Sequence, residues 1–256
     1  MSAAVECAGI WKSYVDAPRV GVKSLLLGRG TVRESRYSRH WALQDVSFSV
    51  APGTGFGVLG HNGSGKTTLL SLLLGTMQAD RGSIVMRGRV ASLIELGAGF
   101  HPELTGRDNV FLYGSILGMR LREIRARYDW IVEFSELEDA VEAPIRTYSA
   151  GMITRLAFSV IASVPAEVLL IDEVLAVGDA RFRTKCQQFL REFKARNGTL
   201  VIVSHSMNDL LEMCEAGMCL DAGKVESTGP IRDVVARYEA RVRAQAPAPV
   251  HAPGAR

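Results

Sequence analysis

The chain has 256 residues, of which 47% are apolar and 22% charged, and its formal net charge is +3. This composition leads us to expect a soluble globular protein. Because the net charge is mild, nothing in it requires a nucleic-acid partner, and we expect none. No run of about 18 apolar residues is present, so we expect no membrane-spanning helix. The first residues lack a basic segment followed by an apolar one, so we expect no signal peptide.

The four cysteines, Cys7, Cys186, Cys214 and Cys219, form no CxxC pair and have no metal-ligand spacing. We therefore expect reduced thiols, in the core or at the surface, of a cytosolic protein.

Strand and helix patterns alternate through the first hundred residues. The expected elements, in chain order, are a strand ending near Tyr14, an alternating strand at 46–50, a short apolar strand at 55–60, a helix at 66–75 and strands near 82–87 and 89–95. From 104 to 162 the strand signals stop and apolar residues recur at helical spacing, which predicts a helical insertion.

Strand and helix patterns return after the insertion. The expected elements are a buried strand ending at Asp172, a helix with an apolar stripe from Phe182 to Phe193, a strand at 198–205, a hairpin turning at Ala222 and Gly223, and a last helix opening with Pro230. We expect one domain over residues 1–240. Its α/β core is formed by about 1–100 and 163–240, and a helical subdomain by about 101–162, followed by a disordered Ala/Pro-rich tail at 241–256.

The strongest motif is GHNGSGKTT at residues 60–68, which matches G-x-x-x-x-G-K-[ST] between an apolar strand and a helix. Glycines let successive backbone N–H groups face one concavity, and together with the helix N-terminus they hold phosphates. Lys66 is expected to reach the β and γ phosphates, and Thr67 to offer its hydroxyl to Mg²⁺. The predicted nucleotide-binding residues of this loop are Gly60, His61, Asn62, Gly63, Ser64, Gly65, Lys66, Thr67 and Thr68. For His61, a solvent-facing side chain without a role is the alternative.

The segment VLLIDE ends a buried strand with two carboxylates. We expect this strand to lie beside the phosphate-loop strand, so that Asp172 holds Mg²⁺ at the ligand-binding edge of the sheet. Glu173 can reach a water that attacks the γ-phosphate, although it could also simply end the strand.

These motifs resemble the ATP-binding cassette (ABC) proteins over about residues 5–240. YSAGM, residues 148–152, stands where the family has its LSGGQ-type signature, at a small-residue helix start that also suits an anion. The resemblance implies a P-loop NTPase (RecA-like) core with an antiparallel β portion and an inserted α-helical subdomain. It also implies an ATPase with ATP and Mg²⁺ as cofactors, which works as a homodimer with two sandwiched nucleotides. Ser149 and Gly151 would then contact the γ-phosphate held by the opposite subunit.

Further roles follow from the same resemblance. His205 matches the switch histidine that senses the γ-phosphate, and Asp179 stands where an aspartate crosses the dimer interface. Tyr14 is the expected adenine-stacking aromatic, with Trp41 as its rival. Where the family has a glutamine, the nearest match is Glu95, which is either an active-site residue and Mg²⁺ ligand or a charge at a strand end. Ala150 and Tyr148 depart from the family signature, and we expect both to be tolerated.

The combination of ALQDVSF, ELGAGFHPELTGRDN, YSAGM and LAVGD looks like the ATPase subunits of polysaccharide exporters for O-antigen, capsule or teichoic acid. Such a subunit would lie on the cytoplasmic face of the inner membrane, dock two integral-membrane subunits and serve a lipid-linked polysaccharide. The alternatives are another ABC transporter ATPase, for an importer or a drug or lipid exporter, and a soluble ABC ATPase without a transport role.

A basic segment at residues 15–40 is typical of the same subfamily. Its positive residues are Arg19, Lys23, Arg29, Arg33, Arg36 and Arg39, with Glu34 as the acid among them. The segment is either a solvated loop or a contact with the inner leaflet or with the pyrophosphate of the lipid-linked substrate.

Overall fold

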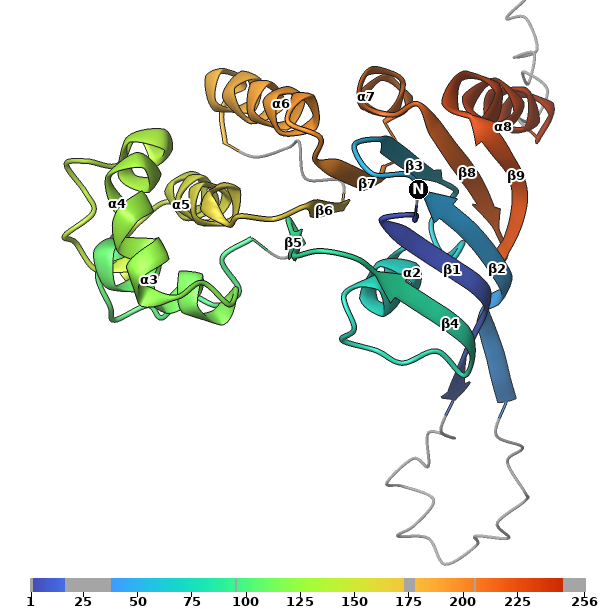
Figure 1. Cartoon of the computed structure of the whole chain (residues 1–256), viewed down its shortest axis with the longest axis horizontal. Helices are drawn as coiled ribbons and strands as arrows, with labels where there is room; N and C mark the ends of the chain where they lie inside the picture. The colour runs from blue at the N-terminus through green and yellow to red at the C-terminus, as the bar shows by residue number, and fades with distance from the viewer. Residues whose placement is uncertain (1, 17–37, 95, 173–177, 205, 246–256) are drawn as a thin grey trace, which may run out of the picture.

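The structure of the protein, a computed structural model, describes residues 2–16, 38–94, 96–172, 178–204 and 206–245. Two β-sheets and their covering helices form one part of the molecule, and the helices of residues 106–163 project to one side of it (Figure 1). Glu95, residues 173–177, which include Glu173, and His205 lie outside the described residues, as do residues 17–37 and 246–256.

The smaller sheet is antiparallel and has the strand order β2-β1-β4. Its strands are β1 (Val5–Asp16), β2 (Ser38–Val50) and β4 (Arg81–Met86). β1 and β2 pair as far as Asp16 opposite Ser38, so they extend beyond Tyr14 and into the basic segment expected at 15–40. That segment is therefore shorter than predicted, because both of its ends belong to strands.

The larger sheet has the strand order β5-β6-β7-β3-β8-β9, and only β9 runs antiparallel. Its strands are β5 (Val90–Ser92), β6 (Val168–Asp172), β7 (Thr199–Val203), β3 (Gly55–Leu59), β8 (Ala216–Asp221) and β9 (Lys224–Pro230). β7 lies between the Asp172 strand and the phosphate-loop strand. The prediction that these two strands are neighbours was wrong, because strands pair according to long-range contacts and not according to the order of motifs in the chain.

One hydrophobic core fills the space between the two sheets. It contains α2 (Lys66–Leu73), whose Leu69 and Leu70 are fully buried, together with Ile10 of β1 and Val201 of β7. The antiparallel sheet therefore covers the helix that follows the phosphate loop. This arrangement fixes the helix N-terminus against the carboxyl ends of the parallel strands.

A second core lies on the other face of the larger sheet. Its helices are α5 (Ala150–Ser163), α6 (Ala180–Ala195), α7 (Met207–Met213) and α8 (Ile231–Gln245). Phe158 and Phe182 are fully buried there, with ring centroids 6.0 Å apart at 84°. Edge-to-face packing of this kind stabilises the contact between α6 and α5, the helix that begins within the YSAGM segment.

The segment between β5 and β6 forms helices, as its spacing predicts. It contains α3 (Gly106–Ile116), α4 (Leu121–Ser135) and the short 3₁₀ turn η1 (Ile145–Thr147), followed by α5. In Figure 1 these helices stand beside the larger sheet, away from the antiparallel one.

The last helix continues to Gln245, so the prediction that a disordered tail begins at residue 241 was wrong. Arg241 is one reason, because its guanidinium pairs with Asp221 and Glu226 of the β8–β9 hairpin. Pro230 ends β9 and the helix begins one residue later. The hairpin turns at Ala222 and Gly223, both with positive φ, as predicted.

All four cysteines are free and buried, so of the two expected locations, core and surface, the core is the one observed. Burial raises the pKa of each to about 12, so the thiols stay protonated at neutral pH. None of the helices in the described part of the chain has the length and apolar character that a bilayer crossing requires.

Asn109 of α3 is fully buried and organises the loop before its helix. Its Oδ1 accepts from the His101 amide at 2.6 Å, and its Nδ2, which carries two hydrogens, lies 2.8–3.1 Å from the carbonyl oxygens of His101, Leu104 and Thr105 and is shared among them. We expect Asn109→Ala to lower the free energy of unfolding by about 2–3 kcal/mol, because it leaves buried backbone groups without partners. Urea unfolding measures this change. Exposed Asp129→Ala is the control and should shift stability by no more than about 0.5 kcal/mol; equal stability of the two variants would contradict the assigned role.

Candidate active site

The phosphate loop, residues 60–65, joins the fully buried strand β3 to α2. Gly65 is the N-cap of α2 at φ 106°, and no side chain caps the helix. A Cβ at Gly65 would lie 2.5 Å from the Ala42 carbonyl oxygen, so only glycine fits this approach. Because glycine has no side chain, the N-cap residue offers no acceptor to the first N–H groups of α2, which suits the binding of an anion there.

The ammonium of Lys66 lies inside the loop. Its Nζ donates to the Gly60 carbonyl at 2.7 Å and to the His61 carbonyl at 3.0 Å, and the residue is 7% exposed. A positive charge is thus held next to the uncapped N-terminus of α2. Both features favour a bound phosphate group.

A cleft of about 470 Å³ opens above the loop. It is lined by Tyr14, His40, Ala42, Asn62, Gly63, Gly65, Lys66, Thr67, Thr68 and Asp172. Thr67 and Asp172 also line an adjoining cleft with Ser92 and Ile94. The structure thus brings the predicted lysine, threonine and aspartate together, although Asp172 follows Lys66 and Thr67 by about a hundred residues in the sequence.

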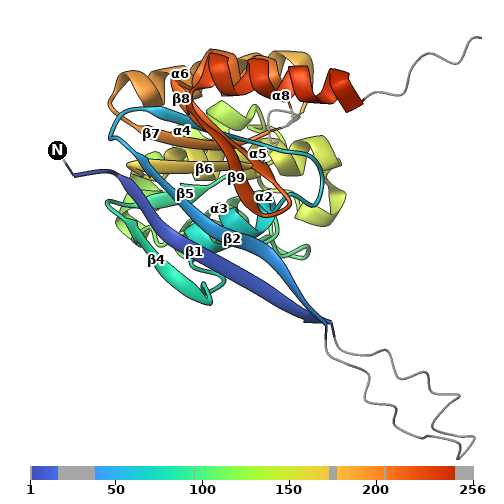
Figure 2. The same ribbon diagram turned by 90° about the vertical axis from the view of Figure 1, so that its right-hand side faces the viewer.

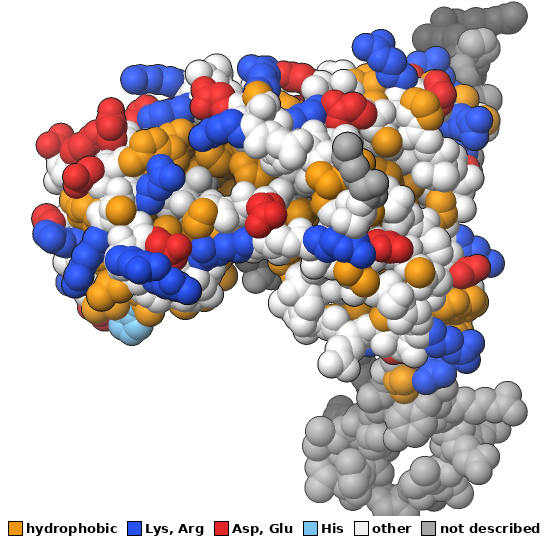
Figure 3. Space-filling view, in the orientation of Figure 1, with side chains coloured by type: hydrophobic (Ala, Val, Ile, Leu, Met, Phe, Trp, Pro, Cys, Tyr) orange, Lys and Arg blue, Asp and Glu red, His pale blue; other side chains and the backbone are white. Residues whose placement is uncertain are grey.

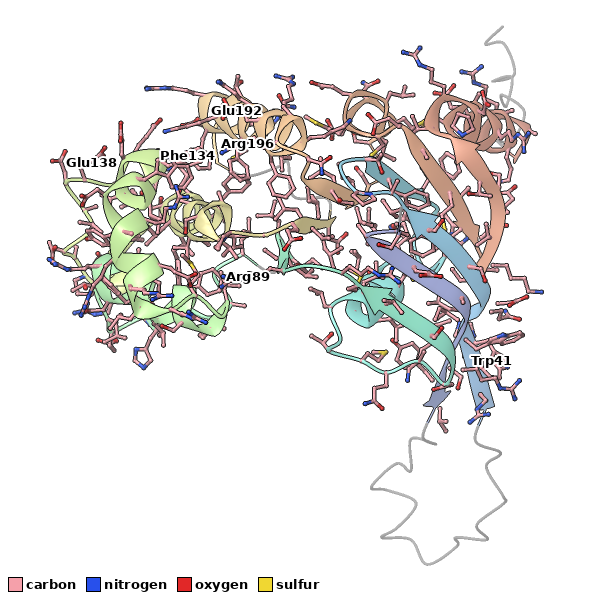
Figure 4. The ribbon with its side chains drawn as sticks, in the orientation of Figure 1. Trp41, Arg89, Phe134, Glu138, Glu192 and Arg196 are labelled. Atoms are coloured by element: carbon pink, nitrogen blue, oxygen red, sulfur yellow. The ribbon has the colours of Figure 1, made fainter. Side chains whose placement is uncertain are left out.

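The two candidates for stacking on adenine, Tyr14 and Trp41, lie on different faces of the antiparallel sheet, because side chains alternate between the two faces along a strand. Tyr14 lines the cleft, and its hydroxyl lies 3.2 Å from the Thr68 Oγ1. Trp41 instead packs edge-on against Trp11, with ring centroids 5.2 Å apart, and lies on the side of β2 away from α2 (Figure 4). The geometry therefore favours Tyr14.

His40 also lines the cleft, opposite Tyr14 in the β1–β2 pair. Sequence reasoning missed this residue. The alternation of side chains along a strand could have identified it, because His40 and Ala42 lie on one face of the strand and Trp41 lies on the other.

His61 is half exposed, but it does not merely face solvent. Its Nε2 lies 2.9 Å from the Asp221 Oδ1, and its Nδ1 lies 2.6 Å from the Asn62 carbonyl oxygen. Ser64, by contrast, is fully buried beneath the loop, and its hydroxyl has no hydrogen-bond partner among the described atoms. Neither of these side chains lines the cleft.

The signature residues form a second cleft, of about 450 Å³. Ser149 caps α5 by accepting from the Met152 amide at 3.2 Å, and Asp179 caps α6 by accepting from the Phe182 amide at 2.8 Å. The cleft is lined by Ser149, Ala150, Gly151, Met152, Thr154, Arg155, Gly178 and Asp179. Among the residues that the structure describes, the two clefts have none in common. Arg155, which pairs with Glu136 at 3.6 Å, is a further residue that sequence reasoning missed.

A cavity of about 560 Å³ lies elsewhere in the described part of the chain. Aromatic side chains of α4 and α6, including Phe134, line it beside Glu192 and Arg196, where Figure 3 shows hydrophobic surface and Figure 4 labels these residues. It also contacts Ala166 and Gly198, just before β6 and β7 begin. The carboxyl ends of these parallel strands lie at the opposite edge of the sheet, so this cavity has no part in the phosphate site.

Comparison with known proteins places the chain in a family. The sequence model described as ABC transporter matches residues 43–176. The O-antigen export system ATP-binding protein RfbB of Klebsiella pneumoniae is 43% identical over 201 residues, which are 78% of this chain and 82% of that protein. The chain belongs to the ABC transporter family. As an ABC transporter ATPase it binds and hydrolyses ATP, the nucleotide that the phosphate loop predicts.

Two other relatives of this ABC ATPase are longer than it is. The ABC transporter protein AbcA of Aeromonas salmonicida is 45% identical over 77% of this chain and 64% of its own length. The teichoic acids export ATP-binding protein TagH of Bacillus cereus is 37% identical over 78% of this chain and 36% of its own length.

Solved structures agree on the fold. The ATP-binding cassette MJ0796, described as a dimer in a post-hydrolysis state bound to ADP and Pi, gives a TM-score of 0.71 at 20% identity and covers 89% of this chain and 99% of its own. The ATP-binding subunit of another ABC transporter gives a TM-score of 0.72 at 20% identity, covering 93% of this chain and 94% of its own. The predicted α/β, P-loop fold class is thereby confirmed.

We expect Tyr14→Ala to weaken ATP binding by about 5- to 100-fold, because an aromatic ring stacked on a base contributes about 1–3 kcal/mol. Trp41→Ala should change ATP affinity less than about 2-fold, since its ring packs on Trp11 outside the cleft. Titration of each purified variant with ATP measures both constants. A larger loss for Trp41→Ala than for Tyr14→Ala would show that the base lies on the other side of β2.

Proposed function

We propose that this chain is the ATP-hydrolysing subunit of a transporter that exports a lipid-linked polysaccharide across the cytoplasmic membrane. The observation that carries the ATPase part is the shared cleft of Lys66, Thr67 and Asp172 beside an uncapped helix N-terminus. Similarity to ATP-binding proteins named for O-antigen and teichoic acid export supports the substrate class.

In this proposal the phosphate loop binds the β and γ phosphates. Its backbone N–H groups and the Lys66 ammonium stabilise the negative charge of the phosphates at the edge of the sheet. Thr67 and Asp172 supply a hydroxyl and a carboxylate, the oxygen donors that Mg²⁺ combines with nucleotide phosphates. When bound, Mg²⁺ stabilises the charge that develops on the transferred phosphoryl group.

The remaining roles rest on the resemblance and concern residues outside the described part of the chain. Glu173 follows Asp172 directly and would orient the attacking water, and His205 would sense the γ-phosphate. Two roles remain possible for Glu95: a contact with water or Mg²⁺ in the active site, or a charge at the end of a strand without a part in catalysis.

Two copies of the chain would complete the site. Ser149 and Gly151 open a helix whose first turn suits an anion, but their cleft is separate from the phosphate cleft of the same chain. A second copy would bring its signature cleft over the first copy's γ-phosphate, with Asp179 at the shared interface. Such a dimer would dock two membrane subunits from the cytoplasmic side.

The dimer makes a specific prediction. Ser149→Arg should leave ATP binding by one chain intact, because Ser149 lies outside the phosphate cleft. It should lower ATP hydrolysis by at least about 100-fold, the order of effect of losing a transition-state contact. Nucleotide titration and phosphate release measure the two quantities. Equal loss of both would contradict an action across the interface, and Asp129→Arg, exposed on α4, is the matched charge control.

The export role is tested in the host cell with the chromosomal copy removed. The unaltered gene should restore surface polysaccharide, whereas Lys66→Ala should not, because the variant lacks the loop cation and should not bind ATP tightly. Immunoblotting of surface polysaccharide and titration of the purified proteins provide the measurements. Restoration by Lys66→Ala, or normal polysaccharide in the deletion strain, would refute the proposed substrate class.

The basic segment gives a finer test of how the substrate is handled. Because Asp16 pairs with Ser38, residues 17–37 can be replaced by a two-residue Asn-Gly turn without disturbing Tyr14 or His40. ATP binding should then persist while export fails, since each basic residue near an anionic leaflet contributes about 1 kcal/mol. Charge reversal at Arg29, Arg33 and Arg36 tests charge with the chain length unchanged. Normal export by both variants would exclude a role in substrate handling.

A further inference from the structure

The turn of the β8–β9 hairpin lies directly against the phosphate loop, and Figure 2 shows the hairpin reaching from α8 toward α2. The Gly223 amide donates to the Ser64 carbonyl at 3.1 Å, and the Gly223 carbonyl accepts from the Gln44 amide at 2.7 Å. Gly223 has φ 79°, and a Cβ there would lie 2.6 Å from the Ala42 carbonyl oxygen. The turn thus bridges the phosphate loop and β2 by backbone contacts that no larger residue would permit.

A side-chain contact reinforces this bridge. The ring of His61, the second residue of the phosphate loop, joins the Asn62 carbonyl oxygen on one side to the Asp221 carboxylate on the other. Both partners are acceptors, so a neutral imidazole donates to one of them and only the protonated ring donates to both; either contact restrains the orientation of the ring. The backbone of residues 60–62 is then fixed relative to the hairpin.

Asp221 is itself held from α8. Its Oδ2 lies 3.0 Å from the Arg241 Nη1, which also lies 2.5 Å from the Glu226 Oε2. The Arg241 side chain is 18% exposed, and its guanidinium stacks over the Tyr238 ring at 5.3 Å. An arginine held between two carboxylates and a ring loses little further freedom on pairing, unlike an exposed surface pair.

The contacts of His61, Asp221 and Arg241 orient the loop atoms that bind the Lys66 ammonium. The carbonyls of Gly60 and His61 both accept from the Lys66 Nζ. Turning the His61 peptide would move both the ammonium and the amides of the concavity. The contacts of Asp221 and Arg241 therefore bear on phosphate binding, although neither residue lines the cleft.

We propose that His61, Asp221 and Arg241 form a positioning chain through which the C-terminal hairpin and α8 hold the phosphate loop in its ATP-binding conformation. The proposal rests on ATP binding by that loop. Asp221 and Arg241 lie beyond residues 43–176, which the ABC transporter family model matches, so the family match does not assign them this role.

A double-mutant cycle tests the link between the loop and the hairpin. His61→Ala and Asp221→Ala should each weaken ATP binding about 5- to 20-fold, and the double variant should be no weaker than the weaker single one, because both remove the same contact. ATP titration of the full chain measures all four affinities. Independent, multiplicative losses, or affinities unchanged in both single variants, would overturn the proposal. Failure of the unaltered chain to bind ATP would instead refute the phosphate-loop function.

Arg241 is tested by rescue and by a matched control. Arg241→Gln should raise the KM for ATP about 3- to 10-fold while kcat at saturating ATP changes less than about 3-fold, and Arg241→Lys should restore most of the affinity. Arg243→Gln breaks the exposed Arg243–Glu239 pair on the same helix and should leave KM within about 2-fold. Equal KM values for Arg241→Gln and Arg243→Gln, or a loss in kcat alone, would overturn the assignment.

Discussion

The ammonium of Lys66, held by two carbonyls of its own loop, is the interaction on which the phosphate site depends. A cation in that position requires a loop whose carbonyls point inward while its amides remain available, and Gly65 meets this demand at φ 106° against the Ala42 carbonyl. β3 leads into the loop between β7 and β8, and α2 leads out of it into the core between the two sheets. The loop is therefore set by rigid elements on both sides.

The same constraint explains why residues far from the motif matter. The hairpin turn can contact the loop only because β8 pairs with β3, which brings Gly223 to the Ser64 carbonyl and Asp221 to His61. Arg241 links that contact to the last helix. A helix that would read as peripheral in the sequence thus becomes part of the support for nucleotide binding.

The two clefts of the chain divide the chemistry between them. The phosphate cleft contains the lysine, threonine and aspartate, whereas the signature cleft contains two helix caps, Ser149 and Asp179, and no phosphate-loop residue. The phosphate cleft and the signature cleft would each contact a different side of a bound triphosphate. In the proposed dimer each complete site takes one half from each copy, so ATP binding would be coupled to a change in assembly.

Local sequence patterns predict the phosphate loop, the strand that ends in a carboxylate, the helical insertion, the helix that follows the signature residues, and the hairpin turn. Each of these is encoded by neighbouring residues: glycine spacing, apolar runs, or a period of 2 or 3.6. Long-range contacts, which no local pattern reveals, place β7 between β6 and β3, put Tyr14 rather than Trp41 in the cleft, and bring His61 to Asp221, 160 positions later. Strand order and cross-chain contacts depend on which surfaces bury best together, and that free energy belongs to the whole fold and not to any local stretch of sequence.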